Sequence, residues 1–243
     1  MSKITAPPPL RRGRQSGPPH MEWRLDGAAD AGDASAPLVL CLHGYGMDED
    51  LFAALLQKLF ALPMRFLVPR APHPVRLHAG PEAANGGSWY AYDGIQEHFR
   101  KELERVEGEL LDLVRDAEAE AGLHPRSRWV MGFSQGGYCG AWLAIRNPST
   151  FSGLIVSGAR VKTELLVAEM AAAAAQRFGV LLCHGEKDRS VTPEAAQRSH
   201  DALAAAGVDV QLKTFDVGHS LGRGQVAAMA EWLTRATGAD AAR

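Results

Sequence analysis

The stretch Trp129-Val-Met-Gly-Phe-Ser-Gln-Gly-Gly137 decides the fold of this chain. Its first three residues are apolar and predict the end of a buried strand, and the small residues after it suit a helix that crosses that strand closely. Between them lies the pattern G-x-S-x-G, centred on Ser134. A serine at so sharp a turn has a strained backbone, so the residues two positions away on either side must be nearly bare of side chain.

This turn predicts an exposed serine hydroxyl at the edge of a sheet. Because a helix begins directly after Ser134, the backbone amide of Gln135 is aimed at the space beside the hydroxyl. The alternative is a Gly/Ser-rich loop that matches the pattern by chance. The strand before the turn and the glycine-rich helix after it disfavour that alternative.

The bulk composition is that of an ordinary globular protein. Hydrophobic residues make up 46% and charged residues 22% of the 243 residues, which suits one α/β domain over residues 21–243. A net charge of −2 gives no electrostatic reason to expect binding to nucleic acid or to an anionic membrane. The three cysteines lie in apolar settings, and their odd number favours reduced thiols in a cytoplasmic protein over a disulfide framework.

Residues 1–20 have a different composition from the rest of the chain, because they are rich in proline and arginine. They contain no apolar segment typical of a secretory signal, and we expect them to form a disordered basic tail. Elsewhere no apolar run is long enough to cross a bilayer, so stable membrane insertion is not expected.

Short apolar runs alternate with helix-forming segments along the chain. Strands are expected at 21–25 (an edge strand), 37–42, 64–69, 129–131, 153–157, 179–183 and 208–215, and helices from 48 or 49 to 59, then at 95–122, after Ser134, at 165–176, 193–206 and 222–237. This order predicts a mostly parallel sheet covered by helices on both faces. Active sites of such sheets gather at the carboxyl ends of the strands.

One long segment, 70–94, has no expected helix or strand and is rich in proline, glycine and aromatic residues. A long loop inside a compact domain is usually functional. The alternative is an irregular surface crossing whose aromatic residues pack into the core. We expect both to hold, with Trp89 and Tyr90 near the mouth of a site, where they bind substrate.

A serine hydroxyl is a weak nucleophile at neutral pH, so Ser134 needs a base within reach and a third group that orients the base. His219 follows the last expected strand and falls at the same sheet edge as Ser134. The chain order serine, acid, histidine then requires a carboxylate between them, and Asp188 fits this requirement. The alternatives are a surface role for His219 and a helix-capping role for Asp188. The rival carboxylates are Glu186 and Asp216.

The loop His43-Gly-Tyr-Gly46 lies at the same edge of the predicted sheet and offers a backbone amide that could stabilise an oxyanion. Attack on a carbonyl creates an oxyanion that preorganised amides stabilise, and losing one donor costs about 3 kcal/mol. Gln135 supplies one amide, and Tyr45, between two glycines, is expected to supply the other. We expect His43 to be structural and to bond the loop backbone. None of the nine histidines shows the spacing of metal ligands, so no metal is expected.

Several segments, in this order, resemble the phospholipase/carboxylesterase family of α/β-hydrolases, which includes acyl-protein thioesterases and small bacterial carboxylesterases. The segments are Leu42-His-Gly-Tyr-Gly-Met-Asp48, Trp89-Tyr90, Gly132-Phe-Ser-Gln-Gly-Gly137, His184-Gly-Glu-Lys-Asp188 and Gly218-His-Ser220. The resemblance implies an α/β-hydrolase fold with a small or absent lid, a triad of Ser134, Asp188 and His219, and oxyanion amides at Tyr45 and Gln135. It also implies activity on esters or thioesters with short to medium acyl chains, and no cofactor. The segment 1–20 and residues 78–87 depart from the family pattern.

The sequence therefore predicts a serine carboxylesterase that hydrolyses short- to medium-chain esters of small molecules through an acyl-enzyme. An acyl thioesterase or lysophospholipase with the same triad is the alternative. A noncatalytic α/β-hydrolase relative that binds a ligand or a partner is a third interpretation, which an intact triad disfavours. The sequence is compatible with a homodimer but carries no pattern that requires one.

Overall fold

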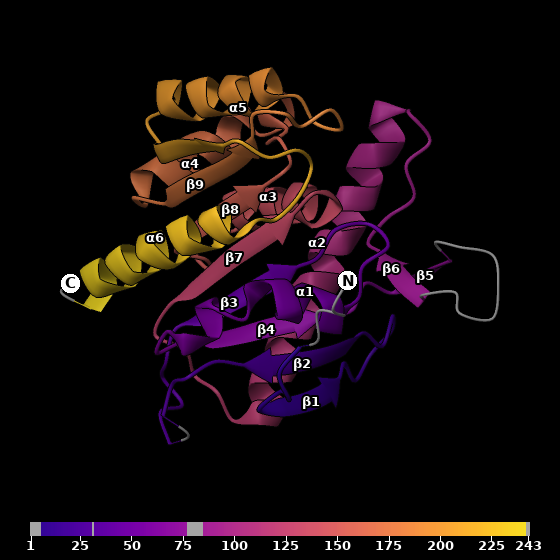
Figure 1. Ribbon diagram of the computed structural model, residues 1–243, viewed down its shortest axis with the longest axis vertical. Coiled ribbons are helices and arrows are strands. Elements are labelled where there is room, and N and C mark those ends of the chain that lie inside the picture. The colour runs from indigo at the N-terminus through magenta and orange to yellow at the C-terminus, as the bar shows by residue number, and fades with distance from the viewer. Residues whose placement is uncertain (1–5, 31, 77–84, 242–243) are drawn as a thin grey trace.

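A computed structural model describes residues 6–30, 32–76 and 85–241, and in these residues an eight-stranded sheet forms the centre of the protein (Figure 1). Its strands are, from one edge to the other, β1 (Arg11–Arg14), β2 (Glu22–Asp26), β4 (Arg65–Pro69), β3 (Leu38–Leu42), β7 (Arg128–Phe133), β8 (Gly153–Ser157), β9 (Gly179–Gly185) and β10 (Asp209–Phe215). From β4 to β10 every pair of neighbours is parallel, whereas β1 and β2 run antiparallel to the strands beside them. The expected mostly parallel sheet is thus confirmed.

Helices follow most of the parallel strands. They are α1 (Glu49–Leu56), α2 (Gln96–Ala121), α3 (Gln135–Arg146), α4 (Val167–Ala175), α5 (Pro193–Ala205) and α6 (Arg223–Ala241), with short 3₁₀ helices η1 (Leu59–Ala61) and η2 (Thr163–Leu165). Within the described part of the chain, none of these helices combines the length and the apolar character needed to cross a membrane.

Side chains along the central strands alternate between two buried clusters, as the pleat of a sheet requires. In β7, Trp129 and Met131 belong to one cluster and Val130 belongs to the other. The cluster with Val130 includes the buried faces of α2, α3 and α4, and the other cluster includes those of α1 and α6. The sheet is therefore covered by helices on both faces, and the ends of its strands are left to form a site.

The prediction of a disordered tail over 1–20 was wrong for residues 11–14, which form β1 at the edge of the sheet. Consequently β2, expected at the edge, is the second strand. Gly13 in β1 lies against the indole of Trp23, whose side chain is only 1% exposed. Arg12 pairs with Asp50 of α1 at 2.5 Å, so the basic composition of this segment is matched by carboxylates of the folded domain.

The expected structureless loop at 70–94 contains a β-hairpin, in which β5 (His73–Arg76) pairs antiparallel with β6 (Asn85–Ser88). The hairpin packs against the loop after β3: the Gly46 amide donates to Gly87 O at 2.9 Å, and the Gly87 amide donates to Met47 O at 2.7 Å. A side chain at Gly86 would place its Cβ 1.9 Å from the carbonyl oxygen of Gly46. The glycines thus permit a close contact that supports the loop containing Tyr45. Most of the segment 78–87 lies outside the described residues.

Candidate active site

Ser134 stands at the sharp turn between β7 and α3, with backbone angles of φ 51° and ψ −119°. Side chains have no room on either side of it. A Cβ at Gly132 would lie 2.2 Å from the oxygen of Gly136, and a Cβ at Gly136 would lie 2.2 Å from the oxygen of Leu42. The two glycines of the pattern are therefore required by contact, and together they hold the serine in a strained conformation.

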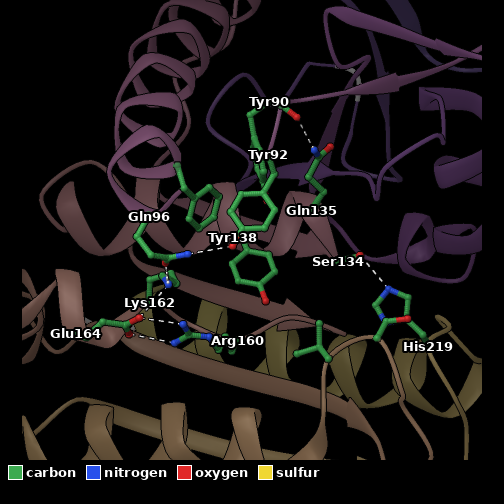
Figure 2. Close-up of a pocket in the computed structure, with 13 residues that line it drawn as sticks. Tyr90, Tyr92, Gln96, Ser134, Gln135, Tyr138, Arg160, Lys162, Glu164 and His219 are labelled. Atoms are coloured by element: carbon green, nitrogen blue, oxygen red, sulfur yellow. Dashed lines mark hydrogen bonds and ion pairs between the residues drawn. The ribbon is translucent and has the colours of Figure 1, made fainter. Parts of the chain in front are cut away.

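The residues expected to act with Ser134 lie beside it, although they come from distant parts of the chain. His219, in the loop after β10, has its Nε2 atom 2.9 Å from the Ser134 Oγ atom. Its Nδ1 atom lies 2.8 Å from Oδ2 of Asp188, in the loop after β9. With the proton on Nδ1 donated to the carboxylate, Nε2 accepts the hydrogen bond of the serine hydroxyl, as general-base activation requires. Figure 2 shows His219 directed at Ser134 along one wall of a cavity.

Asp188 is held as an anion by its surroundings. Burial by itself raises the pKa of this carboxyl, but hydrogen bonds from the Val191 amide, His219 and the Ser190 amide together lower it below the usual value. The two amides donate to Oδ1 at 3.0 and 2.8 Å, so Oδ2 is left to orient the imidazole. The rival carboxylates are engaged elsewhere, since Glu186 accepts a hydrogen bond from Thr214 and Asp216 pairs with Lys187.

The predicted oxyanion amides belong to two segments that the structure fixes firmly. Within the described residues, no hydrogen bond uses the backbone N–H of Tyr45 or of Gln135. The side chain of Gln135 donates to Tyr90 O and accepts from the Trp89 amide, each at 2.9 Å, which locks the start of α3 to the segment after β6. This anchoring role of the Gln135 side chain was not evident in the sequence, where only its amide was considered.

His43 is structural, as expected. Its Nδ1 donates to Gly44 O at 2.8 Å, and its Nε2 accepts from the Ala71 amide at 3.0 Å. Burial lowers the pKa of His43 to about 4, so the imidazole is neutral near pH 7. It therefore fixes the loop that carries Tyr45 without contributing charge.

Trp89 and Tyr90, both expected to bind substrate, occupy different places. The Trp89 side chain is 1% exposed, and its indole donates to His43 O at 2.8 Å. Trp89 is therefore a core residue beneath the Tyr45 loop, and the expectation that it contacts substrate was wrong. Tyr90 lines the cavity beside Ser134 and packs against Phe99 with ring centroids 5.1 Å apart.

The cavity beside Ser134 has a volume of about 560 Å³. Its lining residues are Tyr90, Tyr92, Gln96, Phe99, Ser134, Gln135, Tyr138, Arg160, Lys162, Glu164, Ser190, Val191 and His219. The aromatic residues make up its middle, and three charged residues that sequence reasoning missed lie at the side away from His219 (Figure 2). The signal that could have found them is the position of Arg160 and Lys162 just past the carboxyl end of β8.

No group of three or more histidine, cysteine or acidic side chains is arranged to hold a metal ion among the residues that the structure describes. All three cysteines are free and buried. The groups joined by hydrogen bonds beside the cavity are the Ser134 hydroxyl, the His219 imidazole and the Asp188 carboxylate.

The known proteins that this chain resembles include carboxylesterases and an acyl-protein thioesterase. A probable carboxylesterase of Oryza sativa is 28% identical over 206 residues, covering 80% of this chain and 86% of the relative. An acyl-protein thioesterase 1 of Neurospora crassa is 25% identical over 181 residues, covering 70% of this chain and 73% of the relative. The crystal structure of esterase PE8 superposes with a TM-score of 0.69 at 24% identity, over 87% of this chain and 98% of that structure, which shows a shared fold.

The family model that matches this chain is Phospholipase/Carboxylesterase, and the match runs over residues 28–237. It covers the α/β-hydrolase sheet from β3 to β10 and every loop that carries a residue of the candidate site. With the serine turn, the histidine and the carboxylate all inside the matched region, the chain belongs to the Phospholipase/Carboxylesterase family.

Proposed function

We propose that this protein is a serine carboxylesterase that hydrolyses small-molecule esters with short to medium acyl chains. The observation that carries the proposal is the continuous chain of hydrogen bonds from Ser134 Oγ through His219 to Asp188, at 2.9 and 2.8 Å, beside the cavity. A nucleophile, its base and the group that orients the base are recognised by such geometry rather than by position in the chain.

In the proposed mechanism, the Ser134 oxygen attacks the ester carbonyl while His219 Nε2 takes the hydroxyl proton. The oxyanion of the tetrahedral intermediate accepts hydrogen bonds from the amides of Tyr45 and Gln135. Collapse of the intermediate expels the alcohol, which leaves with the proton from His219. Water then gives a proton to the same imidazole and attacks the acyl-enzyme, and the second intermediate releases the carboxylic acid and restores the serine hydroxyl.

An acyl thioesterase or lysophospholipase would use the same residues in the same steps. One of the relatives is named an acyl-protein thioesterase, which supports testing the thioesterase alternative. The two activities differ in the leaving group, so kcat/KM on oxygen and sulfur esters of one acyl chain separates them. The noncatalytic alternative is disfavoured because Ser134, His219 and Asp188 retain the hydrogen bonds that catalysis requires.

The proposal is tested with p-nitrophenyl esters from acetate to palmitate, on the wild-type protein and on Ser134→Ala. We expect turnover to be highest for the shorter chains and to fall at least about a thousandfold in the variant, since the nucleophile is lost. A fluorophosphonate should label the wild type once per chain and should not label Ser134→Ala. Ser152→Ala, at the amino end of β8 and so at the opposite edge of the sheet, is the matched serine control. Undiminished turnover in Ser134→Ala would refute the proposal.

A further inference from the structure

The side of the cavity away from Ser134 and His219 is charged. Arg160 and Lys162 come from the segment after β8, and Glu164 comes from η2. Figure 2 shows these side chains gathered at one side of the cavity, with Tyr138 between them and Ser134. The mechanism proposed above uses none of them, so their presence in this cavity needs a separate explanation.

The contacts within this group leave a surplus of positive charge. The Arg160 guanidinium donates to both oxygens of Glu164, at 2.9 and 3.0 Å. The Lys162 ammonium lies 2.9 Å from Glu164 Oε1 and donates to Gln96 Oε1 at 2.5 Å. Although its partial burial acts in the opposite direction, the hydrogen bonds from Arg160 and Lys162 lower the pKa of Glu164 to about 2. Two cations therefore share one carboxylate, and the group carries a net charge of +1.

Arg160 and Lys162 share this surplus, because each lies 2.9 Å from the same oxygen, Glu164 Oε1. The Lys162 side chain is only 8% exposed, and its ammonium lies 5.6 Å from the centroid of the Phe99 ring. A buried lysine is costly unless its charge is compensated, and the partners of this ammonium are one shared carboxylate oxygen, one neutral amide oxygen and the face of the Phe99 ring. Since Arg160 and Lys162 line the cavity, an anion bound there would neutralise the remaining positive charge of the group.

We propose that the substrate is an ester with a carboxylate remote from its scissile carbonyl, and that Lys162 and Arg160 bind this carboxylate. The inference rests on the proposed esterase function and names the substrate class of the same site. A monoanionic carboxylate matches a net charge of +1 better than a dianionic phosphate does. Arginine and lysine side chains in a partly buried pocket make charge-assisted hydrogen bonds to such a group.

Two matched pairs of esters test this inference and identify the side of the ester that carries the charge. The first pair is 4-nitrophenyl hydrogen adipate and its methyl ester, which differ by one charge on the acyl side. The second pair is 4-carboxyphenyl hexanoate and its methyl ester, which differ by one charge on the leaving group. For each ester, kcat/KM is first divided by the rate constant of its hydrolysis by hydroxide, which corrects for intrinsic reactivity. The measurement is the ratio of this corrected kcat/KM for the charged member to that for the neutral member of a pair.

For the wild type we expect a ratio of roughly ten or more in at least one pair, as for a hydrogen bond to a charged group. Lys162→Met should lower that ratio about tenfold. Glu164→Gln should raise it about threefold, because it removes the competing carboxylate. A purely structural role for the group would change both members of a pair alike and leave the ratio as it was. Lys101→Met, which removes a lysine paired with Glu97 on the surface of α2, is the control for loss of charge alone.

Ratios near one in both pairs for the wild type would overturn the inference. So would a Lys162→Met variant whose ratios equal those of the wild type. If Lys162→Met does not fold, Glu164→Gln alone decides: a raised ratio supports the inference, and an unchanged ratio overturns it. The proposed esterase function is tested separately in the same assay, because it requires Ser134→Ala to lose activity on the neutral esters whatever the ratios are.

Discussion

At the scale of single residues, the carboxylate of Asp188 has two distinct sets of partners. Oδ1 accepts the amides of Ser190 and Val191, and Oδ2 accepts Nδ1–H of His219. The charge of Asp188 selects the tautomer of His219 in which Nε2 is free to accept the serine proton. The contact of Asp188 with His219 was predictable from the place of Asp188 after a strand, and the coordinates show the rival Glu186 bonded to Thr214 instead.

We predict that Asp188→Asn keeps the fold and lowers kcat by roughly a thousandfold to ten-thousandfold. An asparagine of the same shape can present an N–H to His219, which favours the wrong imidazole tautomer. The check is kcat for a neutral p-nitrophenyl ester together with a thermal melt. Asp216→Asn, which removes an exposed carboxylate paired with Lys187, should retain wild-type kcat. A fall of less than tenfold in Asp188→Asn would contradict the assigned role.

At the scale of elements, local patterns predicted the strands and helices that contain their own signal. The long helix expected at 95–122 is found at Gln96–Ala121, because its apolar residues recur at helical spacing. The β5–β6 hairpin was missed. Its strands are short and contain Pro74 and adjacent glycines, residues that weaken a strand pattern. The hairpin is held by the loop after β3, a contact that no local pattern encodes.

This contact predicts that Gly86→Ala impairs catalysis from outside the cavity. The added Cβ would lie 1.9 Å from the Gly46 oxygen, so the loop that carries the Tyr45 amide must shift. We expect kcat to fall about a hundredfold, as when one oxyanion donor is lost, with little change in KM. Gly108→Ala is the control, because a Cβ at Gly108 in α2 meets nothing within 4 Å. An unchanged kcat in Gly86→Ala would show that the hairpin does not position the loop.

At the scale of the whole molecule, the features that the sequence did not predict are contacts between residues far apart in the chain. The arginines of β1 resembled a disordered tail because Asp50, which pairs with Arg12, lies 38 positions further on. Likewise, Lys162 and Gln96 are 66 positions apart, and nothing in either segment indicates their contact. The serine turn was predictable because the pattern that marks it lies within five residues and the contact of Gly132 with the Gly136 oxygen is local, although the contact of Gly136 with the Leu42 oxygen is not.

Burial of His43 predicts how the stability of the whole protein depends on pH. The pKa of His43 is lowered from 6.5 to about 4, so between these values the unfolded chain binds a proton that the folded chain does not. The neutral imidazole therefore causes no loss of stability above pH 6.5, and the free energy of unfolding falls as the pH is lowered from 6.5 to about 4. The full effect corresponds to about 3 kcal/mol.

The measurement is the free energy of unfolding by urea at several pH values from 7 to 4, for the wild type and for His43→Gln. The substitution lowers stability at pH 7 because the ring contacts and the hydrogen-bond geometry with Ala71 and Gly44 change. The expected difference lies in the slope: the variant should lose about 3 kcal/mol less than the wild type between pH 6.5 and 4, since glutamine does not titrate. Parallel curves would mean that the pKa of His43 is the same in the folded and the unfolded chain, contrary to this prediction. The neutral imidazole would then not be what holds the Tyr45 loop at low pH.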